Sequence, residues 1–231
     1  MPVALITGAS RGLGRALARE LGARGWSLVV DARGEPELFR LAEELDPTRT
    51  VALAGDITEP AHRRALVEAA ERLGGPDLLV NNASHLGPSP QPRLRSYPAE
   101  DLARVYAVDV LAPHDLLRLA VPTLAAREGT VVNVSSDAAV EAYEGWGGYG
   151  SAKAALDQLT AVLAVEEPAL RAYAFDPGDM RTAMQQEAFP GDDISDRPEP
   201  ETVVPALLRL LAERPASGRY RAADLLSPVV G

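Results

Sequence analysis

The sequence contains no cysteine and only one lysine, Lys153, among its 23 basic residues. The absence of thiols excludes disulfide bonds, thiolate catalysis and zinc sites built on cysteine. No apolar run approaches the roughly 20 residues that span a bilayer, and the first residues lack the basic stretch of a secretory signal. The formal charge of −10 at pH 7 disfavours a nucleic-acid backbone, which requires a basic surface. We therefore expect a cytoplasmic protein whose partner is a small molecule, and neither a membrane nor a nucleic acid.

Short apolar runs alternate with longer amphipathic segments, and no repeat or linker divides the 231 residues. Such a pattern is typical of a parallel sheet with helices on both faces. It predicts one α/β domain over residues 1–231, a Rossmann-like doubly wound sheet, with the acidic segment 178–201 as a flap on the substrate side. The expected strands are Val3–Thr7, Ser27–Asp31, Thr50–Gly55, Leu78–Asn81, Gly129–Ser135 and Arg171–Asp176. The expected helices are Gly14–Arg24, Pro36–Glu44, Pro60–Leu73, Ala99–Ala125 and Tyr149–Val165.

A glycine-rich turn follows the first expected strand, with Gly8, Gly12 and Gly14 spaced as Gly-x-x-x-Gly-x-Gly. A pyrophosphate requires close approach of the backbone and binds favourably at a helix N-terminus, where free N–H groups point outward. The first strand–helix junction of a parallel sheet is also where dinucleotides bind. We therefore expect this turn to bind a dinucleotide.

The second expected strand ends in Asp31-Ala32-Arg33. An acidic residue here accepts the adenosine ribose hydroxyl of NAD, whereas an arginine accommodates the 2′-phosphate of NADP. If Ala32 lies at the ribose, Asp31 faces the other side of the strand, and Arg33 and Arg11 are free to contact the phosphate. This register favours NADPH. If Asp31 faces the ribose instead, Arg33 is a solvated loop charge and NAD is the cofactor.

Tyr149 and Lys153 stand four residues apart, so on a helix they lie on the same face. A tyrosine hydroxyl has a pKa of about 10, which is too high for proton exchange near neutrality. A nearby ammonium favours the phenolate and lowers that pKa. The pair therefore predicts a proton-exchanging tyrosine, and it gives a reason for the single lysine.

Several short motifs occur in an order that resembles the short-chain dehydrogenase/reductase family, and the likeness covers nearly the whole chain. They are TGASRGLG (7–14), GDIT (55–58), NNAS (81–84), VVNVSS (131–136), YGSAK (149–153) and DPGDMRT (176–182). The resemblance implies an NAD(P)-dependent oxidoreductase acting on CH–OH and C=O groups. It implies that Tyr149 is the general acid, that Ser136 rather than Ser135 binds the carbonyl oxygen, and that Lys153 also holds the nicotinamide ribose.

The resemblance further implies the residues that bind the cofactor. They are Gly8, Ser10, Arg11, Gly12, Leu13, Gly14, Ala32, Arg33, Asp56, Ile57, Asn82, Ala83, Ser84, Tyr149, Lys153, Pro177, Gly178 and Thr182. Ser84 replaces a family glycine. Asp109 replaces an asparagine that, in relatives, holds a water between the lysine and solvent, and we count it as a catalytic candidate. A carboxylate there also pairs with Lys153, so an altered rate or pH profile is expected.

Further segments resemble the sepiapterin reductase and benzil-type carbonyl reductase branch, which reduces vicinal dicarbonyls with NADPH. They are NNASHLGP (81–88), Ala32-Arg33, Gly145-Trp146, VLAVEEP (162–168) and TAMQQ (182–186). Where sepiapterin reductases carry a pterin-anchoring aspartate, this chain has Ala222, with Asp224 as the nearest carboxylate. A hydrophobic dicarbonyl or other ketone is therefore the expected substrate. The candidate substrate contacts are Ser136, Tyr149, Trp146, Tyr143 and His85.

Two other functions remain open. Asp31 favours an NAD-dependent secondary-alcohol dehydrogenase, and Asp109 favours a catalytically silent dinucleotide sensor, although an intact Ser136, Tyr149 and Lys153 argue against the sensor. No metal site is expected, because the three histidines are scattered without ligand spacing. The resemblance implies a homodimer or homotetramer that pairs through the expected helices Ala99–Ala125 and Tyr149–Val165.

Overall fold

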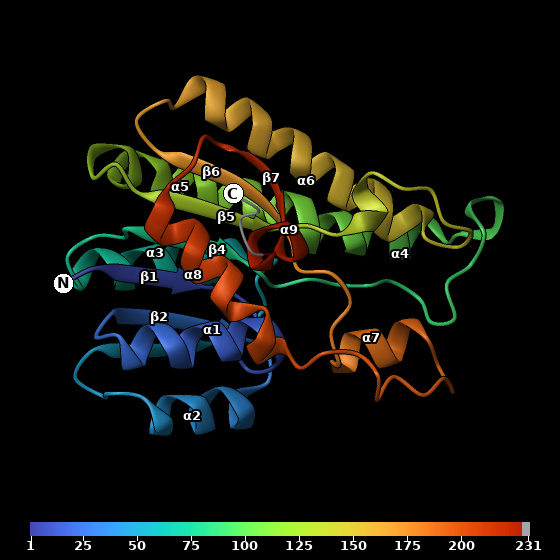
Figure 1. The fold of residues 1–231 in the computed structure, drawn as a ribbon, viewed down its shortest axis with the longest axis horizontal. Helices are drawn as coiled ribbons and strands as arrows, with labels where there is room; N and C mark the ends of the chain where they lie inside the picture. Colours follow the sequence, from blue (N-terminus) through green and yellow to red (C-terminus); the bar gives the residue numbers. More distant parts are fainter. Residues whose placement is uncertain (228–231) are drawn as a thin grey trace.

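A seven-stranded parallel sheet forms the centre of the computed structural model, which describes residues 1–227 (Figure 1). The strand order is β3-β2-β1-β4-β5-β6-β7, and every neighbouring pair is parallel. The strands are β1 (Val3–Ile6), β2 (Ser27–Ala32), β3 (Thr50–Ala54), β4 (Leu78–Asn81), β5 (Thr130–Val134), β6 (Arg171–Asp176) and β7 (Gly218–Arg221). This doubly wound α/β architecture confirms the predicted fold class.

The six expected strands are all present, and their ends differ from the prediction by at most one residue. The central strands are buried because helices cover both faces of the sheet, and β1 is buried along its whole length, whereas the edge strand β3 is only partly buried. A seventh strand, β7, was not expected from the sequence. This edge strand reads Gly-Arg-Tyr-Arg and is only partly buried, so it lacks the continuous apolar run of the others.

Helices lie on both faces of the sheet (Figure 1). One face packs against α1 (Gly12–Ala23), α2 (Glu35–Glu44) and α8 (Val204–Glu213), which share a core with the sheet. The other face packs mainly against α3 (Pro60–Arg72) and α5 (Ala112–Ala126), with α6 (Gly147–Glu166) beside them. A short helix, α9 (Ala222–Leu226), follows β7.

The expected continuous helix Ala99–Ala125 is interrupted. It consists of α4 (Ala99–Tyr106), a π-helical turn (Ala107–Leu111) and α5. Asp109 lies within this turn and is fully buried. Because π-helical turns insert an extra residue and often occur at functional sites, the interruption directs attention to Asp109.

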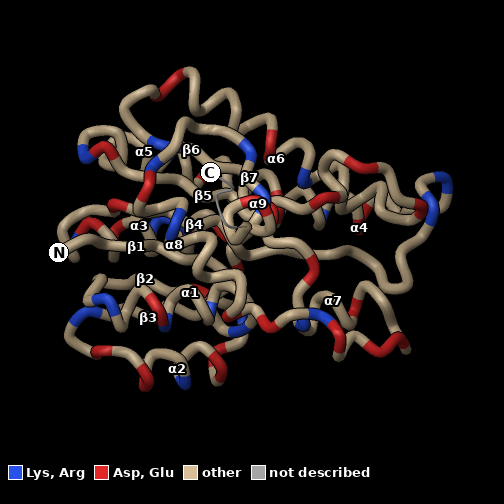
Figure 2. Tube along the Cα trace, in the orientation of Figure 1, with Lys and Arg blue, Asp and Glu red and all other residues tan. Residues whose placement is uncertain are grey.

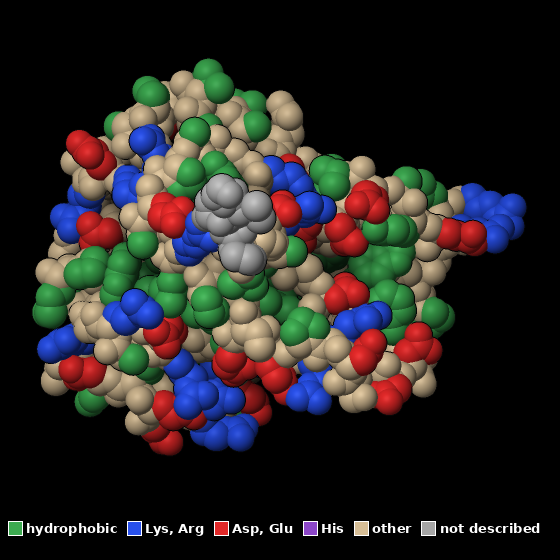
Figure 3. All heavy atoms as spheres, viewed as in Figure 1, with side chains coloured by type: hydrophobic (Ala, Val, Ile, Leu, Met, Phe, Trp, Pro, Cys, Tyr) green, Lys and Arg blue, Asp and Glu red, His purple; other side chains and the backbone are tan. Residues whose placement is uncertain are grey.

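The carboxyl ends of the strands meet along one edge of the sheet, where the glycine turn, Ala83 and Ser136 follow β1, β4 and β5. The segment 178–201 also lies on this side and contains α7 (Ala183–Ala188), which stands apart from the sheet (Figure 1). Acidic and basic residues are both scattered along the whole trace (Figure 2), and hydrophobic side chains gather above α7 on the face shown in Figure 3. Within residues 1–227, no helix has the length and apolarity required to cross a membrane.

Candidate active site

The glycine turn after β1 packs directly on the chain that follows β4. Gly8 and Gly12 have left-handed backbone, with φ of 65° and 58°. A Cβ on Gly8 would lie 2.8 Å from Cα of Ala83, and one on Gly14 would lie 2.5 Å from the amide nitrogen of Asn82. That amide donates a 3.0 Å hydrogen bond to the carbonyl of Gly8. Side chains at Gly8 and Gly14 are therefore excluded on steric grounds, and the backbone itself forms the floor of the site.

Helix α1 begins at Gly12, and no side chain caps its N-terminus. Its first N–H groups are therefore available to an anion, and the helix dipole favours negative charge there. The turn and the helix together fit the pyrophosphate of a dinucleotide.

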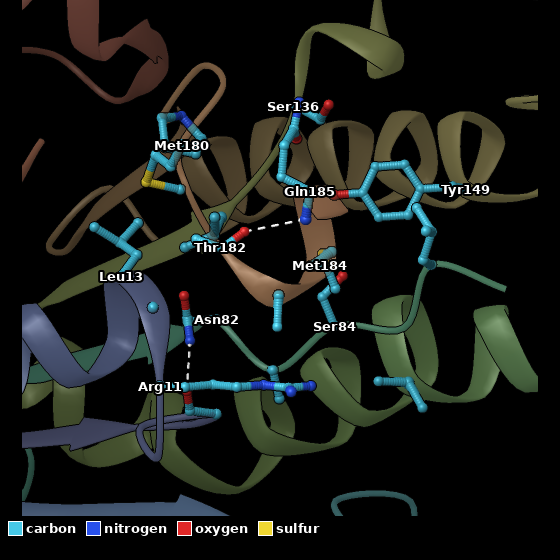
Figure 4. A pocket seen from close by; sticks show the side chains of 18 of the residues that line it. Arg11, Leu13, Asn82, Ser84, Ser136, Tyr149, Met180, Thr182, Met184 and Gln185 are labelled. Carbon is cyan, nitrogen blue, oxygen red and sulfur yellow. Dashed lines mark hydrogen bonds between the residues drawn. The ribbon is translucent and has the colours of Figure 1, made fainter. Parts of the chain in front are cut away.

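One pocket extends from the glycine turn to Tyr149 along the carboxyl ends of the strands (Figure 4). Arg11 and Asn82 lie at one end, Ser136 and Tyr149 at the other, with Thr182 between them in this view. Every predicted cofactor contact lines the pocket except Gly14, which packs against Asn82 beneath it.

At the adenosine end, Asp31 is almost fully buried and its carboxylate contacts the imidazole of His62, 2.6 Å away. Arg33 is exposed and lines the pocket. Burial disfavours the ionised form of Asp56, but hydrogen bonds from Thr58 and Arg104 outweigh it and lower the pKa of Asp56 to about 2. Asp56 therefore remains a carboxylate at neutral pH.

The two serines after β5 have different surroundings. Ser135 is buried, and its hydroxyl accepts a 2.9 Å hydrogen bond from Arg219. Ser136 is half-buried, and its hydroxyl donates to Asp137 at 2.9 Å and accepts from the N–H of Ala138 at 3.2 Å. Both line the pocket, but the local turn and not the arginine holds the Ser136 hydroxyl. This environment is compatible with the predicted role of Ser136.

Tyr149 and Lys153 lie in the first two turns of α6, and both are buried. The Lys153 ammonium lies 5.4 Å from the centroid of the Tyr149 ring and donates a 3.0 Å hydrogen bond to the carbonyl of Val134. Burial raises the pKa of Tyr149, whereas Lys153 lowers it. The Lys153 ammonium thus shifts the pKa of Tyr149 downward, as predicted. In the absence of bound cofactor, burial has the larger effect, and the pKa of Tyr149 is raised overall.

Asp109 lies behind this pair, outside the pocket lining. Its Oδ1 is 3.9 Å from the Lys153 ammonium and accepts a 3.0 Å hydrogen bond from the backbone N–H of His85. Its Oδ2 is buried and has no hydrogen-bond partner among the described residues. Burial raises the pKa of Asp109, while Lys153, Ser84 and His85 oppose that shift. The carboxylate in turn raises the pKa of Tyr149.

The substrate end of the pocket is apolar. Leu86, Trp146, Met184 and Ala188 line it, the last two from the segment 178–201, whereas Met180 packs near Leu13 on the α1 side of the pocket. The Trp146 ring meets the Tyr149 ring edge to face, with centroids 5.8 Å apart. Periodicity alone did not indicate the methionines, because they belong to a segment without a clear strand or helix pattern.

Two predicted substrate contacts, Tyr143 and His85, do not line the pocket. The Tyr143 hydroxyl donates to the carboxylates of Glu141 and Asp137 in an exposed turn, and its ring meets that of Trp146 edge to face, with centroids 6.5 Å apart. The backbone N–H of His85 is bonded to Asp109. Neither residue therefore forms a pocket wall in this structure.

Arg219 of β7 is a site residue that the sequence analysis missed. Its guanidinium donates to the Ser135 hydroxyl at 2.9 Å, to Asp157 at 2.8 Å, to the Ser136 carbonyl at 3.0 Å and to Asp176 at 2.8 Å. It thereby connects the ends of β5 and β6 with α6. The sequence did contain one indication of such a residue. Asp157 and Asp176 stand in apolar segments, and buried carboxylates require a cationic or hydrogen-bonding partner.

No group of three or more His, Cys, Asp or Glu side chains in residues 1–227 is arranged to hold a metal ion.

Comparison with known proteins assigns the chain to a family. The sequence model of the short chain dehydrogenases matches residues 2–193. Sepiapterin reductase of Mus musculus is 39% identical over 204 residues, covering 80% of this chain and 77% of that protein. A benzil reductase ((S)-benzoin forming) of Saccharomyces cerevisiae is 32% identical over 237 residues, covering 99% of this chain and 86% of that protein.

Solved structures agree with this assignment. A short chain dehydrogenase from Escherichia coli CFT073, complexed with NADPH, superimposes with a TM-score of 0.88 at 26% identity, covering 96% of each chain. The predicted resemblance to the family and to its sepiapterin and benzil reductase branch is confirmed. The chain belongs to the short chain dehydrogenase family and is an NAD(P)-dependent oxidoreductase.

Proposed function

We propose that the protein is an NADPH-dependent reductase of ketones and vicinal dicarbonyls with apolar, uncharged substituents. The observation that carries the proposal is the position of Ser136, Tyr149 and Lys153 at the apolar end of a pocket whose other end is a dinucleotide-binding glycine turn. Relatives named sepiapterin reductase and benzil reductase support a carbonyl substrate.

NADP fits the residues present. The Gly8–Gly14 turn and the α1 N-terminus would hold the pyrophosphate, and Arg11 and Arg33, both exposed on the pocket wall, would hold the 2′-phosphate. Lys153 would hold the nicotinamide ribose. The E. coli relative solved with NADPH supports this choice over NAD.

The protein's own groups handle the proton and the carbonyl oxygen, while the bound cofactor supplies the hydride. Tyr149 donates its proton to the oxygen as charge develops there. Ser136 donates a hydrogen bond to the same oxygen and orients it toward Tyr149. The Lys153 ammonium stabilises the phenolate that remains. The apolar side chains of Trp146, Leu86 and Met184 pack beside Tyr149 and would limit the access of water to the reacting carbonyl.

The charges around the site favour neutral substrates. Asp137 lines the pocket beside Ser136 and has no cationic partner within residues 1–227, so the carboxylate of a keto acid would meet like charge there. At the position expected for a pterin-anchoring aspartate, Ala222 is buried, and Asp224 pairs with Arg221 on the surface. An apolar diketone therefore fits better than a pterin.

We expect purified enzyme to oxidise NADPH in the presence of aromatic vicinal diketones such as benzil, followed by the loss of NADPH absorbance. Sepiapterin and an α-keto acid should react at least about tenfold more slowly in kcat/KM, since one lost or opposed polar contact costs roughly 1–3 kcal/mol. NADH would be run in parallel. If the protein bound NADPH tightly but turned over no carbonyl or alcohol, the proposal of a reductase would be wrong, and a dinucleotide sensor would explain the binding.

Asp109→Asn is expected to shift the alkaline limb of kcat/KM for reduction to lower pH. Reduction requires protonated Tyr149, and the Asp109 charge raises the pKa of that hydroxyl. Asparagine keeps the shape and removes the charge, so the pKa of Tyr149 falls and the proton is lost at lower pH. The pH–rate profile measures this shift, with Asp224→Asn on the surface as control. A limb that stays in place in Asp109→Asn would show that Asp109 does not act on Tyr149.

Association of subunits is part of the same proposal. Leu111, Val162 and Val165 are exposed apolar residues beside α5 and on α6, the helices through which pairing is expected. Their exposure supports a homodimer or homotetramer that would cover them.

A further inference from the structure

His62 contacts Asp31, an acidic residue at the adenosine end of the pocket, which Glu37 and Asp56 also line. Its Nε2 lies 2.6 Å from Oδ1 of Asp31, and the two side chains are 12% and 2% exposed. The imidazole also packs against Gly55, since a Cβ there would lie 2.4 Å from Nδ1 of His62. Helix α3 thus places the ring between Gly55 and Asp31, in a position that leaves it little freedom.

This contact affects whether the Asp31 carboxylate, at the end of β2, is available to bind a cofactor. A free carboxylate there accepts a hydrogen bond from the ribose diol of NAD, and it repels the 2′-phosphate of NADP. In this structure Oδ1 accepts from an imidazole N–H, provided that the hydrogen is on Nε2. The hydrogen bond orients the carboxylate toward His62 of α3 and offsets part of its negative charge.

The other groups around Asp31 do not replace His62. Burial raises the pKa of Asp31, while His62 and the N–H of Gly8 lower it, and the neighbouring Asp56 raises it. Asp56 is itself engaged by Thr58 and Arg104. His62 is therefore the one side chain identified around Asp31 that compensates its charge.

We propose that His62 is a specificity-determining residue, which favours NADP over NAD by holding the Asp31 carboxylate away from the adenosine ribose. Arg11 and Arg33 then face the 2′-phosphate without competition from Asp31, while Glu37 pairs with Arg40 and Asp56 with Arg104. The inference rests on the proposed NADPH preference and assigns a function to a histidine that has no place in the catalytic chemistry.

The test measures the dissociation constants of NADPH and NADH directly, by calorimetry, without any substrate. We expect the wild type to bind NADPH more tightly. His62→Leu should reduce the ratio of the NADH to the NADPH dissociation constant by about tenfold, which corresponds to about 1.4 kcal/mol. The matched control is His114→Leu, an exposed histidine of α5 whose loss should leave the ratio unchanged.

A second variant distinguishes the effect of losing the imidazole from the effect of releasing the Asp31 carboxylate on the cofactor preference. In the double variant His62→Leu/Asp31→Asn, position 31 carries no carboxylate, so the preference for NADPH should return even though the histidine is absent. Thermal unfolding of each variant identifies molecules that fail to fold, and the double variant removes the uncompensated buried charge that would destabilise His62→Leu.

Each outcome decides a different claim. A wild type that binds NADH more tightly overturns the proposed cofactor, and the inference with it. A wild type that prefers NADPH, with an unchanged ratio in folded His62→Leu, overturns the role of His62 alone. So does a double variant with the same ratio as His62→Leu.

Discussion

Replacing Tyr149 with phenylalanine is expected to lower kcat for carbonyl reduction by at least about a hundredfold, because a positioned general acid contributes roughly 10²–10⁴-fold. Phenylalanine retains the ring that packs against Trp146, 5.8 Å between centroids, and removes only the hydroxyl. NADPH affinity should change by less than about tenfold, since one neutral hydrogen bond contributes roughly 1 kcal/mol. Steady-state kinetics and a binding titration on the same preparation measure both effects.

Tyr220→Phe is the matched control. The Tyr220 hydroxyl donates to the nearby carbonyl of Ala216, and the residue does not line the pocket. Its loss should leave kcat within about twofold, because surface changes outside a site stay within roughly 0.5 kcal/mol. Substantial turnover in Tyr149→Phe, together with a normal control, would contradict the assignment of Tyr149 as proton donor.

The glycine turn and the tyrosine–lysine pair could be predicted from the sequence because their chemistry is local. Close approach to a phosphate requires glycines in the first strand–helix turn, and two residues four apart on a helix share a face. Tyr149 and Lys153 lie in one helix, and Gly8 and Gly12 in one turn, so their placement depended on neither the strand order nor long-range packing. The six apolar strands were visible for the same reason.

Contacts between distant segments were not predictable in this way. His62 appeared as one of three scattered histidines, and only the pairing of β2 with β3 and the packing of α3 bring it to Asp31. The π-helical turn around Asp109 contains neither glycine nor proline, so a continuous helix was expected there. Arg219 lies in an edge strand without an apolar run, and its acceptors come from β5, β6 and α6. The features that could not be predicted from local sequence patterns therefore lie at the candidate active site.

Arg219→Ala is expected to impair both stability and catalysis. Removing one partner of a buried ion pair costs about 3–5 kcal/mol, and because the Arg219 side chain is 25% exposed we expect roughly 2–3 kcal/mol. For a domain of this size the melting temperature would fall by roughly 4–12 °C. The Ser136 carbonyl would lose its 3.0 Å hydrogen bond, so kcat should fall more than NADPH affinity. Calorimetry and steady-state kinetics measure the two effects.

The pH dependence of this loss distinguishes an ion-pair role from simple packing. Burial raises the pKa of Asp157 and of Asp176, and Arg219 lowers both. Without the guanidinium both values rise further, so the folded variant binds protons more readily and its stability falls as pH increases. The difference in melting temperature from the wild type should therefore be larger at pH 8 than at about pH 5.

Two further variants complete the argument for Arg219. Lysine keeps the charge but not the planar set of donors, so Arg219→Lys should recover only part of the stability and activity. Arg221→Ala, two residues along the strand, removes a pair with Asp224 in which both side chains are more than half exposed, 62% and 59%. Such a surface pair contributes about 0–1 kcal/mol, so this control should behave almost as the wild type. If Arg219→Ala and Arg221→Ala lost equal stability at both pH values, the four hydrogen bonds of Arg219 would not hold the catalytic strand ends together.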